Sequence, residues 1–353
     1  MKPCRLALLS CFILAATACL AAGSPEAPPL PSSAPTAIEP LKWLGRTELP
    51  GYTGDFDHLA VDRREQRLFM AAEDHGSLEV FDLKTGAHLR TLSTFDTPHA
   101  IFVVPGTDRI IVTDSGKGYS RVLDRKTLDV IGTIKLAPGA DSSSYDPSTG
   151  HFYIVTGGGD VGMKVNYLNE IDPKTGHVLR QLAIDSDHTE AIQAEQHGQR
   201  LFVNLADRNV VAVIDKQTLR IIARWPIVGA QANLSSALDE AHHRLFVVTR
   251  KPTRMFVLDT DSGKTVATLD VPAIVDGVFF DAARQRIYVP GAVGEVGVYQ
   301  EIDPDHYREL ARVPSAVGGK SGLFVASMDR FYVAASPGKR VGGAVLWYEV
   351  LPR

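Results

Sequence analysis

A set of polar residues recurs at one position of a sequence repeat, and their side chains are of the kinds that bind cations or polar ligands. Each lies ten residues before a basic residue that opens a short apolar run. The seven positions hold Asp57, His99, Asp141, Glu190, Leu234, Asp276 and Lys320, and Asn233 stands beside the one apolar member. Because four carboxylates outnumber one lysine, the set favours a positively charged ligand.

The interpretations of this set differ in what it binds. A general ligand site would consist of Asp57, His99, Asp141, Glu190, Asn233, Asp276 and Lys320. A metal site would consist of the carboxylates and the imidazole alone, namely Asp57, His99, Asp141, Glu190 and Asp276. Such oxygen and nitrogen donors suit a hard or borderline divalent cation, so a divalent cation is the one cofactor that the residues suggest. A third interpretation assigns no ligand, because the mouth of a water-filled channel is polar in any case.

Sequence motifs that pair a nucleophile with a base are missing: the chain has no Ser-His-Asp ordering, HExxH or CxxC. We therefore expect a binding or interaction protein rather than an enzyme. The alternatives are a metal-dependent hydrolase or lyase similar to the lactonase-type propellers, and a structural scaffold. His58 is expected to face a neighbouring sheet, because adjacent residues of a strand point to opposite sides. His242 and His243 are expected to form an exposed pair in a hairpin.

The elements that must position these residues are strands of a sevenfold repeat. A basic residue followed by two or three apolar residues occurs seven times, 42 to 49 residues apart, starting at Arg67, Arg109, His151, Arg200, Arg244, Arg286 and Arg330. Periods of about 40 to 45 residues made of short strands are typical of propeller blades. The first strand of each blade lines the central channel, so the polar set should form a ring near one of its mouths.

Hairpins and outer strands complete each repeat. The second apolar segment of six repeats ends in an Asp before a turn, at Asp82, Asp124, Asp172, Asp215, Asp259 and Asp303, where the carboxylate can accept bonds from turn N–H groups. One extra outer strand, 43–49, precedes the first repeat, whereas the last repeat ends on its third strand. The sequence therefore predicts an all-β, seven-bladed propeller over 41–353 that is closed when the N-terminal strand joins the last blade.

These repeats resemble those of the YVTN-repeat or YncE-like seven-bladed propellers of bacterial envelopes. The resemblance covers about residues 41 to 353 and rests on the segments 57–62, 152–156, 201–204 and 172–176. It implies a propeller fold and an exported location. Members of the family share no single activity, so the resemblance assigns no catalytic residue.

The N-terminus predicts export. Lys2 and Arg5 precede an apolar run and small residues, which is typical of a signal peptide over 1–18 with cleavage near 18–22. Cys19 would then lead the mature chain and is a candidate for lipidation. The three cysteines, Cys4, Cys11 and Cys19, all lie in this region, so no disulfide is expected in the propeller. Residues 19–40 are rich in Pro, Ala and Ser and predict a tether.

Composition and charge narrow the classes of partner. A formal net charge of −4 gives no basic footprint for a nucleic-acid backbone. No apolar run reaches the length of a membrane span, although a lipid anchor fits the leader. We expect a monomeric periplasmic or secreted protein, or an outer-membrane-anchored lipoprotein. Its partner would be a small molecule, a peptide or an envelope protein.

Overall fold

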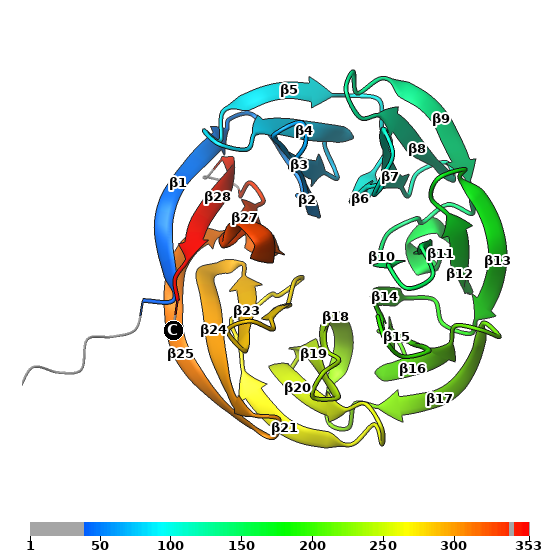
Figure 1. Ribbon diagram of the computed structural model, residues 1–353, viewed down its shortest axis with the longest axis vertical. Helices are drawn as coiled ribbons and strands as arrows, with labels where there is room; N and C mark the ends of the chain where they lie inside the picture. The colour runs from blue at the N-terminus through cyan, green and yellow to red at the C-terminus, as the bar shows by residue number, and fades with distance from the viewer. Residues whose placement is uncertain (1–38, 339–341, 353) are drawn as a thin grey trace, which may run out of the picture. The chain divides into compact units, whose positions relative to one another are not determined.

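The computed structural model describes residues 39–338 and 342–352, which form seven four-stranded antiparallel sheets around a common axis (Figure 1). Helical structure in these ranges is limited to two 3-10 turns, η1 (Gly159–Val161) and η2 (Ala326–Met328). The prediction of an all-β, seven-bladed propeller is confirmed. The predicted signal peptide, Cys19 and nearly all of the predicted tether lie outside the described residues and stay predictions.

Six blades are continuous in sequence, and each has four consecutive strands in the order in which they follow along the chain. Blades 1 to 3 contain β2 (Leu59–Asp62), β3 (Arg67–Ala72), β4 (Ser77–Asp82) and β5 (His88–Leu92); β6 (Pro98–Val103), β7 (Arg109–Asp114), β8 (Tyr119–Asp124) and β9 (Val130–Lys135); and β10 (Ser143–Asp146), β11 (His151–Gly157), β12 (Asn166–Asp172) and β13 (His177–Ile184). Blades 4 to 6 contain β14 (Thr189–Ala194), β15 (Arg200–Leu205), β16 (Val210–Asp215) and β17 (Arg220–Pro226); β18 (Gln231–Asp239), β19 (Arg244–Lys251), β20 (Thr253–Asp259) and β21 (Thr265–Asp270); and β22 (Phe279–Asp281), β23 (Arg286–Gly291), β24 (Val293–Asp303) and β25 (His306–Val317).

Blade 7 joins the two ends of the propeller. It contains β26 (Gly319–Val325), β27 (Arg330–Ala335) and β28 (Gly343–Val350), and its outer strand is β1 (Leu41–Leu49). β1 pairs with β28 from Leu41 opposite Val350 to Leu49 opposite Gly343. Figure 1 shows this contact as the blue strand beside the red one. The predicted closure is confirmed: β28 is paired on both sides, and β1 is the outer strand of blade 7, as the fourth strands are in the other blades.

The core lies between the blades. Phe102 of β6 stacks on Phe152 of β11 with ring centroids 4.5 Å apart, and Val155 of blade 3 belongs to the same buried cluster as Val203 of blade 4. Because neighbouring blades cover both faces of each inner sheet, the second strands are apolar on both faces and read as continuous runs such as Leu68–Ala72. This packing holds the first strands in place around the axis.

The recurrent Asp occupies the predicted hairpin position in most blades. Asp82, for example, lies opposite Arg67 in the strand register, and its carboxylate accepts bonds from the N–H groups of the turn. The equivalence proposed for Asp303 is wrong, since Arg286 lies opposite Gln300. The hairpin of blade 6 extends three residues further, and Asp303 accepts a bond in that later turn.

Candidate functional site

Irregular strand pairing presents the ring residues to the channel. Asp57 N–H donates to Ala71 O, whereas Ala71 N–H donates to His58 O, so two consecutive residues just before β2 share a single partner. Asp141 and Ser142 share Val155 in the same way. The register is also interrupted where β6, β14, β18 and β26 carry the equivalent positions. Such bulges turn side chains away from regular alternation and are common beside functional sites.

Six of the seven predicted polar residues line one cavity of about 610 Å³ at the channel mouth: Asp57, His99, Asp141, Glu190, Asp276 and Lys320. The seventh, Asn233, does not line it. Its side chain is buried and its amide donates to Val210 O at 3.0 Å, and Leu234 takes the position in the cavity wall. The bulge between Asn233 and Ser235 explains the difference, because it decides which residue faces the axis.

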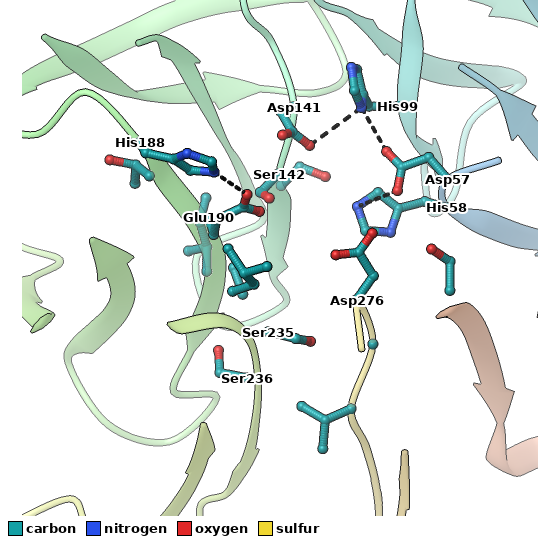
Figure 2. A pocket seen from close by; sticks show the side chains of 18 of the residues that line it. Asp57, His58, His99, Asp141, Ser142, His188, Glu190, Ser235, Ser236 and Asp276 are labelled. Atoms are coloured by element: carbon teal, nitrogen blue, oxygen red, sulfur yellow. Dashed lines mark hydrogen bonds and ion pairs between the residues drawn. The ribbon is translucent and has the colours of Figure 1, made fainter. Parts of the chain in front are cut away.

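Three carboxylates, Asp57, Glu73 and Asp141, form a negative wall of the cavity, and His99 lies among them. Its Nδ1 lies 2.7 Å from Asp57 Oδ2 and 3.5 Å from Asp141 Oδ1 (Figure 2). Its Nε2 lies 4.0 Å from Glu73 Oε1. Burial alone would lower the pKa of His99, but the charge of Asp141, the bond to Asp57 and the charge of Glu73 raise it to about 10. His99 is therefore an imidazolium at neutral pH. Burial alone would raise the pKa of Asp57, yet His58, His99 and Lys320 hold it below its usual range.

The negative charges of two carboxylates of this wall, Asp141 and Glu73, are poorly balanced by cations or hydrogen-bond donors of the protein. Among the described residues no hydrogen bond reaches the side chain of Asp141 or Glu73, and the nearest cation of each is the shared His99. Burial and the charges of Asp57 and Asp141 raise the pKa of Glu73 to about 7, although His99 opposes the shift. Burial, Asp57 and Asp276 raise the pKa of Asp141 in the same sense. Both groups would be stabilised by an added positive charge.

The remaining ring residues are paired with cations of the protein. Asp276 lies 2.8 Å from Arg250 and 2.9 Å from Lys320, and Lys320 also reaches Asp55 at 2.9 Å.

Glu190 lies 2.6 Å from His188, whose pKa the bond raises to about 9 (Figure 2). Burial, with Asp141 and Asp276, raises the pKa of Glu190 to about 7 against the effect of His188. Eight carboxyl groups line the cavity against Arg250, Lys320 and three histidines, so its charge is negative.

The geometry supports a smaller metal site than the sequence predicts. Two groups at the mouth place ligand atoms within 4.8 Å of one another: Asp57 with His58 and Asp141, and Asp57 with Glu73 and His99. Glu190 and Asp276, which the sequence suggested as metal ligands, belong to neither group. Their carboxylates are turned to His188 and to Arg250 and Lys320, which neutralise them.

The expectation for His58 is wrong. Its side chain lines the cavity, 3.7 Å from Asp57, instead of packing against a neighbouring sheet. Regular alternation does not apply because His58 precedes β2 and shares its backbone partner with Asp57. The bulge therefore places two adjacent side chains at the same mouth.

Glu73 and Arg250 are site residues that the sequence interpretation missed. Both lie six residues after the basic residue that opens a second strand: Glu73 directly follows β3, and Arg250 is the penultimate residue of β19. Since first and second strands are antiparallel, this position returns to the channel mouth. Counting six residues forward from each basic residue gives Glu73, Ser115, Gly157, Ala206, Arg250, Ala292 and Ser336, of which only Glu73 and Arg250 are ionisable. That count would have found them.

Comparison with known proteins supports the fold and a distant sequence relationship. No family model matches the chain. The chain is 30% identical to the "Uncharacterized protein YncE" of Salmonella typhimurium (strain LT2) over 118 residues, which are 33% of this chain and 30% of that protein. The protein of the same name from Salmonella typhi is 29% identical over 118 residues, with the same coverage. The matched region thus spans less than a third of these relatives, and it bears out the resemblance to YncE-like propellers.

A solved structure shares the architecture. A chain from the crystal structure of the mitotic checkpoint complex superposes with a TM-score of 0.70 and 14% identity, over 95% of this chain and 99% of that one. At this identity the likeness shows the propeller fold alone, because a fold does not by itself determine function. None of the described residues form a helix with the length and hydrophobicity that a membrane span requires.

Proposed function

We propose that this protein is an exported cell-envelope propeller whose channel mouth binds a ligand carrying an ammonium or guanidinium group, as a small molecule or as a side chain of a basic peptide. The main observation behind this proposal is that Asp141 and Glu73 lie on one cavity wall and share His99 as their nearest cation. Export is supported by the apolar leader and its flanking Lys2 and Arg5.

The wall fits such a ligand chemically. Carboxylates accept charge-assisted bonds from ammonium and guanidinium groups, and these bonds are about twice as strong as neutral ones. Asp57 is already hydrogen-bonded to His99 at 2.7 Å, so the ligand would bind Asp141 and Glu73 and leave this bond intact. Arg250 of blade 5 and Lys320 of blade 7 are held by Asp276 and Asp55 and would repel a cation placed beside them. The ligand's positive end is thereby directed to the wall of blades 1 to 3.

Calorimetric titration with spermidine, arginine amide and a dilysine peptide tests this proposal. Asp141→Asn should weaken binding about tenfold, because a hydrogen bond to a charged group contributes roughly 1.5 kcal/mol. The matched control is Asp270→Asn, since Asp270 is an exposed acid at the end of an outer strand. Binding should also weaken with added salt. Failure of all three probes to bind, or equal loss in the control variant, would refute the proposal.

A metal-dependent hydrolase is the second candidate, and the two overlapping groups of possible ligands around Asp57 favour it. A divalent ion held by Asp57 with His58 and Asp141, or by Asp57 with Glu73 and His99, would supply a Lewis acid and an activated water. Elemental analysis of wild type and of Asp57→Asn distinguishes the two candidates. A stoichiometric metal that the variant loses would favour the hydrolase, whereas equal metal content in both would favour the organic cation.

A further inference from the structure

A second cluster of titratable residues lies five residues along β18 from the channel position Leu234, about 17 Å at the usual rise of a strand. His242 Nδ1 lies 2.6 Å from Asp239 Oδ2 and 3.2 Å from Glu301 Oε1. The Asp239 and Glu301 side chains are 3% and 0% exposed. His242 and His243 therefore do not form the expected exposed pair, because His242 contacts two buried acids, one from blade 5 and one from blade 6.

Glu301 lacks the bonds that a buried carboxylate requires. Neither of its side-chain oxygens makes a hydrogen bond among the described residues, and its nearest neighbour with a positive charge is His242, when that ring is protonated. Burial, the charge of Asp239 and the close contact with its carboxyl raise the pKa of Glu301 to about 7, although the charges of His242 and Arg244 oppose the shift. A buried acid without hydrogen bonds is costly, so the arrangement calls for a cation.

Two other blades carry a base at the place of Glu301, beside an acid equivalent to Asp239. Asp239 ends its first strand as Asp62 and Asp146 do in blades 1 and 3. Glu301 is equivalent to Arg125 and Lys216, because each donates its backbone N–H to the residue that precedes the basic residue of the second strand.

At the two equivalent places the buried acid meets a base from the next blade. Arg125 Nε donates to Asp62 at 2.8 Å, and Lys216 Nζ donates to Asp146 at 2.9 Å. Between blades 5 and 6 a second acid stands at this position, so the positive charge that Arg125 and Lys216 supply in blades 2 and 4 is missing.

The other buried acids at the ends of first strands also have a strong base. Glu195 is paired with Arg200, and Asp281 with Arg284 at 3.0 Å, both within the same blade. Arg244 is the residue of blade 5 that is equivalent to Arg200, but it bonds to Asp259, Asp305 and carbonyl groups and not to Asp239. Among the described acids at this position, Asp239 is thus the one whose close cation is a histidine.

We propose that Asp239, His242 and Glu301 bind a divalent metal ion, with zinc as the best match, which joins blades 5 and 6 in place of the missing base. One imidazole and two carboxylates are a donor set that zinc accepts, and calcium prefers oxygen donors alone. Ligand atoms of a tetrahedral zinc ion are roughly 3.3 Å apart, so a small outward shift of His242 admits the ion. His242 is 35% exposed, which gives the ion a route from solvent and leaves a position for water.

The test is a zinc titration of the full-length, EDTA-dialysed protein by calorimetry, with the melting temperature recorded at each zinc concentration. Glu301→Lys restores the base found at Lys216 and should lose one bound zinc ion while it melts no lower than the metal-free wild type. Zinc should raise the wild-type melting temperature by several degrees. The same loss of one ion is expected in an Asp141→Asn background, which separates this site from the channel mouth.

If Glu301→Lys does not fold, Glu301→Gln serves in its place and should weaken zinc binding at least about 100-fold. An equal number of zinc ions bound by wild type and by the Glu301 variant would overturn the proposal. Wild type that binds no zinc at 100 µM would also overturn it, and would leave a shared proton between the two acids. Neither result would affect the function proposed for the channel mouth.

Discussion

Replacement of His99 by Gln should remove most of a pH dependence that the channel mouth imposes on stability. In the folded protein the carboxylates of Asp141, Asp57 and Glu73 outweigh burial and raise the pKa of His99 to about 10, against about 6.5 in an unfolded chain. Because the folded pKa is the higher one, the stabilisation is fully present below pH 6.5. It is lost as the pH rises through about 10.

The magnitude follows from the width of this interval. Each unit of pKa difference corresponds to about 1.4 kcal/mol, so the free energy of unfolding should fall by on the order of 4 kcal/mol between pH 6.5 and 10. His99 is 10% exposed, so little of this interaction is screened by solvent. The glutamine can still donate to Asp57, so the variant removes the charge and keeps a polar contact.

Urea unfolding at pH 6, 8 and 10 measures the effect. His99→Gln should be much less stable than wild type at pH 6, and the difference should shrink towards pH 10. His197→Gln is the control, because His197 is 90% exposed and should change stability little at any pH. A difference between His99→Gln and wild type that is the same at pH 6 and pH 10 would refute the assignment of His99 as the buried cation of the mouth.

Three further perturbations test the site and the ring. Glu73→Gln should raise the free energy of unfolding at pH 8 by roughly 1–2 kcal/mol, since a carboxyl whose pKa is raised to about 7 destabilises the fold once it ionises; lower stability in the variant would contradict this. Lys216→Met should cost about 3–5 kcal/mol in denaturant unfolding, because Asp146 is left buried without its base, whereas the exposed Lys117→Met should cost little. Deletion of residues 1–49 should lower the melting temperature by at least about 10 °C, because β28 loses its partner β1; an unchanged transition would show that the seam is dispensable.

The architecture could be predicted from the sequence because the same structural features recur in each repeat. A basic residue, an apolar run buried on both faces and an Asp turn recur with nearly constant spacing, and the count of strands requires β1 to close blade 7. Counting back ten residues also located the channel positions, since equivalent residues of a repeat occupy equivalent places.

Details that depend on irregular backbone were out of reach. A bulge has no sequence signature here, so neither the inward turn of His58 nor the exchange of Asn233 for Leu234 followed from alternation. Contacts between blades were also hidden, because Asp239 and Glu301 are 62 residues apart and meet only once two sheets are packed. Because the hairpin of blade 6 is extended, Glu301 stands close to Asp303 in sequence and resembles part of the turn.

Proton release on ligand binding is the most direct test of the cation site at the channel mouth. The pKa of Glu73 is raised to about 7 and that of Asp141 is raised above its usual range, and a bound cation favours the ionised form of both groups. Titration of spermidine at pH 7 in buffers of different protonation enthalpy should therefore show release of up to about one proton per ligand, less in Glu73→Gln and almost none at pH 9. Binding without proton release at pH 7, or release that is unchanged in Glu73→Gln, would contradict the assignment of these carboxylates as the site of the ligand's positive charge.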